Sequence, residues 1–126
     1  MRFKGSPWWK QLTPLTVEEE NAVRLPIITA LKRFEHGQAD SHDMGVLSGS
    51  IRVCKYLTKY FENEKELTYI LNDGYVALEM TRINGKIETD RIPAVRQAAL
   101  LCDDLLMKCE RFRVCEAIEK AQGVKK

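Results

Sequence analysis

The segment of residues 44–61 carries apolar side chains over about half the circumference of a helix. Its main face recurs at helical spacing and consists of Met44, Leu47, Ile51, Cys54, Thr58 and Phe61. This much apolar surface predicts the central helix of a bundle. A strip nearly opposite combines small and aromatic residues: Gly45, Gly49, Tyr56 and Tyr60. The two glycines predict the close approach of a backbone or a bulky ring, and the tyrosines suit a bundle neighbour or another molecule.

Similar patterns predict four main helices, near residues 17–36, 41–62, 64–84 and 91–111 or beyond. The links between them are short, and the chain has no alternating strand pattern of useful length. We therefore expect an all-α protein, an up-down four-helix bundle with an irregular N-terminal arm. Six core positions are expected to be nearly fully buried: Leu47, Ile51, Leu71, Leu78, Val95 and Leu106.

The helix boundaries follow from capping and stop residues. The predicted N-caps are Thr16, with Glu19 completing a capping box, Asp40 or Ser41, and Asn63, and the predicted stops are Gly37 and Asn84-Gly85. Pro93 suits the first turn of the fourth helix.

Three features interrupt the helical patterns. Pro26 predicts a kink or a break near Leu25, because proline removes a backbone donor and restricts the residue before it. Gly74 lowers helix stability but permits a neighbouring helix to come close. The apolar face of the last helix loses its phase near Phe112, so the final segment either continues on a shifted face or forms a separate short helix.

Composition divides the chain into an arm of residues 1–15, a helical bundle domain of residues 16–122 and a frayed tail of residues 123–126. The arm has no acid; its cations are Arg2, Lys4 and Lys10, and its aromatics are Phe3, Trp8 and Trp9. One interpretation is that the tryptophans fold back and cover one end of the bundle, since large aromatics rarely stay fully hydrated. The other is a binding arm whose aromatics and cations contact a nucleic acid or an acidic partner.

The third helix has a second apolar stripe, almost opposite its core face, formed by Tyr69, Val76, Met80 and Ile83. A four-helix bundle needs only one apolar face from each helix. The stripe is therefore either covered by the arm, with Trp8 and Trp9 as a lid, or it is an interface for a second copy or for a target protein.

Candidate chemistry is sparse. The densest polar cluster is Glu35, His36, Asp40, His42 and Asp43, but its spacing matches no established metal motif, and capping explains these residues. The cysteines form no Cys-x-x-Cys pair and indicate reduced thiols of a cytoplasmic protein: Cys54, Cys102, Cys109 and Cys115. Because the sequence contains no catalytic constellation and no phosphate loop, we expect that the protein is not an enzyme and that it holds no metal and no cofactor. The chain has no apolar run long enough for a membrane span.

The distribution of charge, more than its total, supports nucleic-acid binding as an alternative function. The net charge of +2 is too small to argue for nucleic-acid binding by itself. However, Arg52, Lys55 and Lys59 form a basic strip on one helix. Together with the cations of the arm, this strip could contact phosphates.

The order of several features resembles a group of small helical proteins encoded by phages, prophages and plasmids of proteobacteria. The resemblance covers residues 13–109 and rests on Pro14-Leu15-Thr16, Leu25-Pro26, Ala30-Leu31, Gly37, Asp43, Leu47, Gly85-Lys86-Ile87, Val95-Arg96, Ala98, Leu100 and Asp103-Asp104. The cysteines depart from that group, which tends to have alanine or valine there. The resemblance implies an accessory protein of a mobile element in a bacterial cytoplasm, and it implies no site residues.

These observations together predict a non-enzymatic protein-binding accessory protein that modulates a host or phage protein, such as a defence or regulatory factor. A homodimer is one expected way to use the apolar stripe. The alternative is a nucleic-acid-binding regulator that uses the arm and the basic strip.

Overall fold

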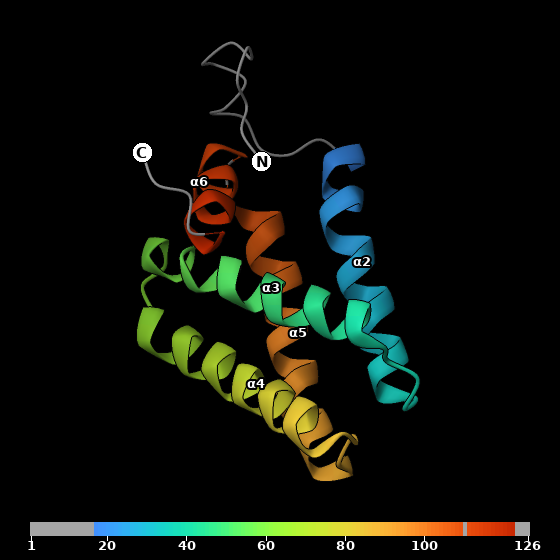
Figure 1. Ribbon diagram of the computed structural model, residues 1–126. Helices are drawn as coiled ribbons and strands as arrows, with labels where there is room; N and C mark the ends of the chain where they lie inside the picture. Colours follow the sequence, from blue (N-terminus) through green and yellow to red (C-terminus); the bar gives the residue numbers. More distant parts are fainter. Residues whose placement is uncertain (1–16, 110, 123–126) are drawn as a thin grey trace.

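The computed structural model describes residues 17–109 and 111–122, with side chains described for 24–109 and 113–122. Figure 1 shows that these residues are helical throughout, apart from short links. The α-helices are α2 (Val17–Glu35), α3 (Ser41–Lys55), α4 (Glu64–Asn84), α5 (Ile92–Lys108) and α6 (Arg111–Ala121), and two 3-10 turns are η1 (Thr58–Tyr60) and η2 (Thr89–Arg91). The described ranges contain no strand, so the all-α prediction is confirmed. The arm, Thr16 and the tail lie outside them.

Helices α3 and α5 form the centre of the packing. α3 contacts α2, α4, α5 and α6, and α5 contacts α2, α3 and α4. In Figure 1, α2 and α5 run in opposite directions from end to end of the domain, while α3 passes across them in front and α4 returns below it. The expected central role of the second main helix is therefore confirmed. The regular up-down bundle is not confirmed, since α3 crosses α2 and α5 instead of running alongside them.

A capping box fixes the link between α2 and α3. The backbone N–H of Asp43 donates to Asp40 Oδ1 at 2.9 Å, and the N–H of Asp40 donates back to Asp43 Oδ2 at 3.1 Å. Arg33 of α2 adds a charge-assisted hydrogen bond from Nε to Asp43 Oδ2 at 2.7 Å. Asp40 is thus the N-cap, one of the two predicted residues.

The remaining predicted caps and stops lie where the sequence places them, but one of them makes no capping hydrogen bond. Gly37 and Gly85 follow α2 and α4 with φ angles of 70° and 75°, a conformation that favours glycine. Pro93 lies in the first turn of α5, as predicted. Asn63 precedes α4, but its side chain makes no capping hydrogen bond.

Two helix predictions need correction. The predicted helix 41–62 is too long, because α3 ends at Lys55 and a turn followed by η1 leads to Phe61. The backbone N–H groups of Tyr56 and Leu57 donate to the carbonyls three residues earlier, at 3.1 Å and 2.9 Å, which makes a tighter turn than that of an α-helix. The predicted break near Leu25 is also wrong, since α2 stays helical through Pro26. The residues that follow the proline, Ile27, Ala30 and Phe34, are buried and hold this part of the helix against the core; the kink stays a prediction.

The last segment is a separate helix. Cys109 adopts an extended backbone with φ −89° and ψ 149°, and α6 follows it and packs on α3. Val114, Cys115 and Ala117 of α6 are buried. The loss of phase near Phe112 therefore marks the corner between α5 and α6.

The core contains all six predicted positions, none of them more than 2% exposed. Of the described glycines, Gly74 has the tightest surroundings, since a Cβ atom there would lie 2.3 Å from Ala98 Cβ and 3.0 Å from the carbonyl oxygen of Ala94. The close approach predicted at Gly45 and Gly49 is wrong for the part of the chain that the structure describes, since a Cβ at either position would meet none of its atoms within 4 Å. The helix that needs a glycine is α4, at its contact with α5.

The glycine contrast gives a first prediction. We expect Gly74→Ala to lower the free energy of unfolding by about 1–3 kcal/mol, because α4 and α5 must move apart to admit the methyl group. Gly49→Ala, the matched control on α3, should raise it by up to about 1 kcal/mol through helix propensity alone. Urea unfolding followed by circular dichroism measures both changes. Equal effects of the two substitutions would contradict the close contact at Gly74.

The capping network gives a second prediction, on pH. The hydrogen bond from Arg33, and then that from the Asp40 backbone, hold the pKa of Asp43 below its ordinary value. Since the native pKa lies below the unfolded one, the stabilisation is present near neutral pH and is lost as the pH falls from about 5 towards 2.

We therefore expect Asp43→Asn to have a lower melting temperature than the parent at pH 7, with the difference shrinking in acid. Asp73→Asn, on the exposed side of α4, is the control and should leave the melting temperature near that of the parent at each pH. Thermal melts across this pH range test the expectation. A constant difference between Asp43→Asn and the parent would argue against the ion pair.

Candidate functional site

The outer face of α4 carries the two most exposed large apolar residues of the described chain, Tyr69 and Ile83, together with exposed Val76. Tyr69 is 71% exposed, Ile83 is 66% exposed and Val76 is 55% exposed, while Met80 is half-buried. These four residues are called the α4 outer stripe below. Tyr69, Val76 and Ile83 are spaced by seven positions and so lie along one side of the helix.

The opposite side of α4 prevents the stripe from turning inward. It holds the buried residues Leu67, Leu71, Gly74, Ala77, Leu78 and Thr81. The helix cannot rotate without removing these residues from the core. The α4 outer stripe therefore points away from the core.

Polar groups border the α4 outer stripe. Arg82 and Glu79 form an ion pair at 2.9 Å on the helix surface, which lowers the pKa of Glu79 and raises that of Arg82. Exposed Asn72 and Asp73 lie between Tyr69 and Val76, and an open hollow beside Tyr69 is lined by Lys65, among others. An apolar line with a polar rim is typical of a protein-binding surface.

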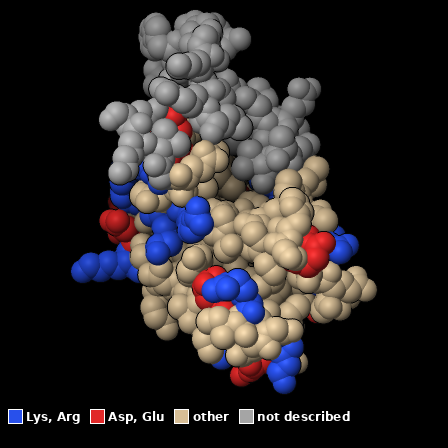
Figure 2. Space-filling view, in the orientation of Figure 1, with Lys and Arg blue, Asp and Glu red and all other residues tan. Residues whose placement is uncertain are grey.

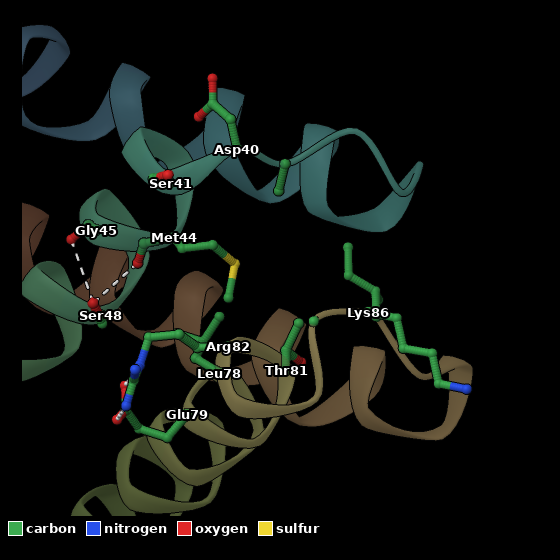
Figure 3. A pocket seen from close by; sticks show the side chains of 13 residues that line it. Asp40, Ser41, Met44, Gly45, Ser48, Leu78, Glu79, Thr81, Arg82 and Lys86 are labelled. Atoms are coloured by element: carbon green, nitrogen blue, oxygen red, sulfur yellow. Dashed lines mark hydrogen bonds and ion pairs between the residues drawn. The ribbon is translucent and has the colours of Figure 1, made fainter.

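A groove of about 550 Å³ lies between the start of α3 and the end of α4. Figure 3 shows that Met44 extends across this groove, while the Asp40 carboxylate and the Lys86 ammonium point away from it. The Ser48 hydroxyl donates to the carbonyl of Met44 at 2.9 Å, and Arg82 is paired with Glu79. These polar groups are therefore satisfied locally or directed outward, and they do not converge on one point of the groove.

A second groove, of about 450 Å³, lies between α2, α3 and α6. Its lining is mostly apolar: Pro26 and Ile27 of α2, Val46 and Val53 of α3, Leu106 of α5, and Ile118 of α6. Gly45 and Gly49 also line it, and we call it the glycine groove. The small residues of α3 therefore border empty space instead of a close helix contact.

The basic strip does not lie on one helix as predicted, since Arg52 and Lys55 are in α3 and Lys59 is in η1, and it continues onto α6. Arg52, Lys55 and Lys59 are exposed, and Arg52 Nη2 donates to the carbonyl of Ala121 at 2.9 Å. Arg113 of α6 stacks over the ring of Tyr60 at 4.1 Å, and Lys59 lies 5.2 Å from the same ring. Figure 2 shows Lys and Arg side chains on this face, near the C-terminal half of α3.

Acids and aromatics accompany these cations. The Tyr60 hydroxyl donates to Glu116 at 3.3 Å, and burial and this carboxylate raise the pKa of Tyr60. Lys120 pairs with Glu116 at 3.6 Å. A hollow of about 350 Å³ is lined by Arg52, Lys55, Tyr56 and Ala121. The sequence did not reveal the contribution of α6, because basic residues in a segment of uncertain phase cannot be assigned to a face.

The structure disperses the predicted polar cluster. Glu35 pairs with Arg96 of α5, the His36 ring donates from Nδ1 to the carbonyl of Lys32 at 2.7 Å, and Asp43 belongs to the α3 capping box. Across 17–109 and 111–122, no three His, Cys, Asp or Glu side chains are placed to hold a metal. These residues therefore cap helices and join them.

The four cysteines are buried, and none of them forms a disulfide. The Cys54 thiol lies 3.8 Å from the carbonyl oxygen of Cys102, where α3 meets α5. The hydrogen bond with the Cys102 thiol and burial raise the pKa of Cys54 well above its ordinary value. A protonated thiol inside the core is a packing group and a poor nucleophile.

The predicted site residues divide into two groups. Tyr69, Val76, Met80, Ile83, Arg52, Lys55 and Lys59 lie on described surfaces, and Trp8, Trp9, Arg2, Lys4 and Lys10 lie outside the described residues. The described residues define an all-helical fold with an exposed apolar face on α4. Among the helices described, none has the length and apolar character needed to cross a membrane. Comparisons with protein-family models, with curated proteins and with solved structures give no match.

Proposed function

We propose that this protein is a non-enzymatic binding protein and that the α4 outer stripe is its interface with another protein. The exposure of Tyr69, Val76 and Ile83 in one line, opposite a core face that cannot be turned out, carries the proposal. Removing such side chains from water is the main source of free energy in protein association. The absence of converging polar groups in the groove of Figure 3 agrees with a function based on surface contact.

The seven-residue spacing of the α4 outer stripe favours a helical partner. Side chains repeated every seven residues fit a second helix that runs along α4, because its apolar residues then meet each anchor in turn. Glu79 and Arg82 at the edge supply one charge of each sign, which suits a partner helix with a mixed polar border. A second copy of α4 is one such helix, and the experiment below separates a homodimer from a different partner.

The biological setting that we propose rests only on the resemblance of residues 13–109 to small helical proteins of phages, prophages and plasmids. On that basis, the partner is a host or phage protein, for example a defence or regulatory factor. The protein then acts as an accessory protein of a mobile element in the bacterial cytoplasm.

The third prediction tests the interface. We expect Val76→Glu with Ile83→Glu to keep the fold and to change the free energy of unfolding by no more than about 0.5 kcal/mol, because both side chains are exposed. The charges should abolish self-association in light scattering, or the capture of the partner by the tagged full-length chain. The matched control is Leu25→Glu with Leu100→Glu, which places the same charges at residues 58% and 49% exposed on α2 and α5.

Loss of association in the α4 variant alone would support the proposed interface. An α4 variant that keeps the oligomeric state and every captured partner of the parent would exclude it. Loss of association in the control variant would move the interface to α2 and α5.

A second candidate function, the binding of nucleic acid, rests on a different observation. The strip of Arg52, Lys55 and Lys59 gains Arg113 and Lys120 from α6, next to the exposed ring of Tyr56. Cations beside an accessible aromatic ring suit single-stranded nucleic acid, in which bases stack and phosphates pair. Glu116 offsets part of this charge, so the observation ranks below the α4 outer stripe.

The fourth prediction tests this function. If the strip binds nucleic acid, Lys55→Gln with Lys59→Gln should weaken the binding of single-stranded DNA and reduce the slope of log K against log salt by roughly 1.4. Lys65→Gln with Lys86→Gln removes the same charge from other surfaces and should change affinity less. Fluorescence anisotropy with labelled oligonucleotides measures both. No binding at low salt, or equal effects of the two variants, would exclude the strip.

A further inference from the structure

The glycine groove is an apolar space that the described helices leave open. Val46 and Val53 of α3 and Ile118 of α6 are only partly buried along it. At its α3 wall, a side chain on Gly49 would meet nothing within 4 Å. The glycine therefore leaves this part of the groove open, and among the described residues no side chain fills it.

The N-terminal arm has the length to reach this groove. Sixteen residues precede Val17, the first residue of α2, and Pro26 in the groove wall lies nine residues further on. That separation is about 14 Å along a helix, at 1.5 Å per residue. The eight residues from Trp9 to Val17 can span up to about 26 Å when extended, so a chain that turns back along α2 can place Trp8 and Trp9 at the groove.

Position favours this groove over the other apolar surfaces. In Figure 1, the start of α2 and helix α6 lie at the same end of the domain, whereas α4 lies toward the opposite end. The glycine groove is lined by α2 and α6, and the groove of Figure 3 is lined by α3, α4 and the link that follows α4. The groove bordered by α2 and α6 is therefore the nearest apolar site for a segment attached at Val17.

The chemistry of the groove suits indole rings. Its apolar wall accepts the ring body, and a volume of about 450 Å³ lies within the range of about 300–1,000 Å³ typical of compact ligands. Arg52 lines the groove, and its bond to the Ala121 carbonyl holds its guanidinium there for a cation–π contact. The Ser50 hydroxyl donates to Val46 at 2.7 Å and keeps lone pairs that can accept an indole N–H.

We propose that the N-terminal arm docks in the glycine groove through Trp8 and Trp9. This inference does not depend on the function proposed for the α4 outer stripe. It assigns the predicted folding-back of the tryptophans to one site, and it leaves Tyr69, Val76 and Ile83 uncovered for a partner.

Tryptophan fluorescence of the full-length chain tests the proposal, because Trp8 and Trp9 are its only tryptophans. In the parent protein, we expect emission shifted to the blue of the same protein in denaturant and weaker quenching by acrylamide. Gly49→Leu should fill the groove, shift the emission toward the denatured value and increase quenching several-fold. Helical circular dichroism should not change, since the position is open.

Two controls place leucine or charge on the competing surfaces. Ser48→Leu enters the groove of Figure 3, and Val76→Glu alters the α4 outer stripe; both should keep the emission of the parent. A melting-temperature cycle adds an independent measurement. Trp8→Ala with Trp9→Ala should lower the melting temperature in the parent background but not in the Gly49→Leu background.

Several results would overturn the proposal. Parent emission equal to that in denaturant would show that the arm does not dock. A response to Ser48→Leu or Val76→Glu, but not to Gly49→Leu, would place the tryptophans elsewhere. A blue shift that disappears on dilution would assign the groove to the arm of a second copy.

Discussion

The contact between α4 and α5 at Gly74 is the constraint on which the rest of the arrangement depends. Ala98 Cβ occupies the space of the missing side chain, and Ile51 of α3 lies 3.6 Å from the same point. Three helices therefore meet at a position where only hydrogen fits. Because interiors are close-packed, any larger group would separate α4 from α5 and loosen the contacts of both with α3. This contact also sets the rotation of α4, and with it the outward direction of the α4 outer stripe.

Ion pairs set the register of α2 against α5 more than they stabilise the fold. Arg24 donates to Asp103 at 3.0 Å, and Glu35 pairs with Arg96. The residue numbers rise along α2 as they fall along α5, so the two pairs fit only one antiparallel register. Such partly exposed pairs contribute about 0–1 kcal/mol each, whereas every other register would leave all four charges without these partners. Apolar burial therefore supplies the stability, and the charges select among similar packings.

Sequence periodicity was sufficient to predict the core, because residues such as Leu71 and Val95 recur at helical spacing and both are buried. It also located the stripe that contains Val76, and the exposure of that residue is consistent with an interface. It could not place α6, because the direction of the chain after Cys109 depends on one extended residue. Nor could it separate Gly74 from Gly49, since the same residue type serves a tight contact in one helix and an open groove in another. Only the neighbours decide between the two, and they are distant in the sequence.

The two apolar surfaces of this protein, on α4 and beside Gly49 of α3, are built in different ways. A helix can present an apolar surface by adding apolar side chains, as α4 does with Tyr69 and Ile83, or by omitting them, as α3 does at Gly49. The first surface projects and gains free energy when a partner covers it. The second is concave and gains contacts when a large side chain enters it, because its walls lack packing partners on one side. A projecting surface leaves the choice of partner to the partner's shape, while a groove within reach of the chain's own tryptophans already has a candidate occupant. The proposed interface on α4 and the proposed docking site of the arm lie on different surfaces, so occupation of one would leave the other open.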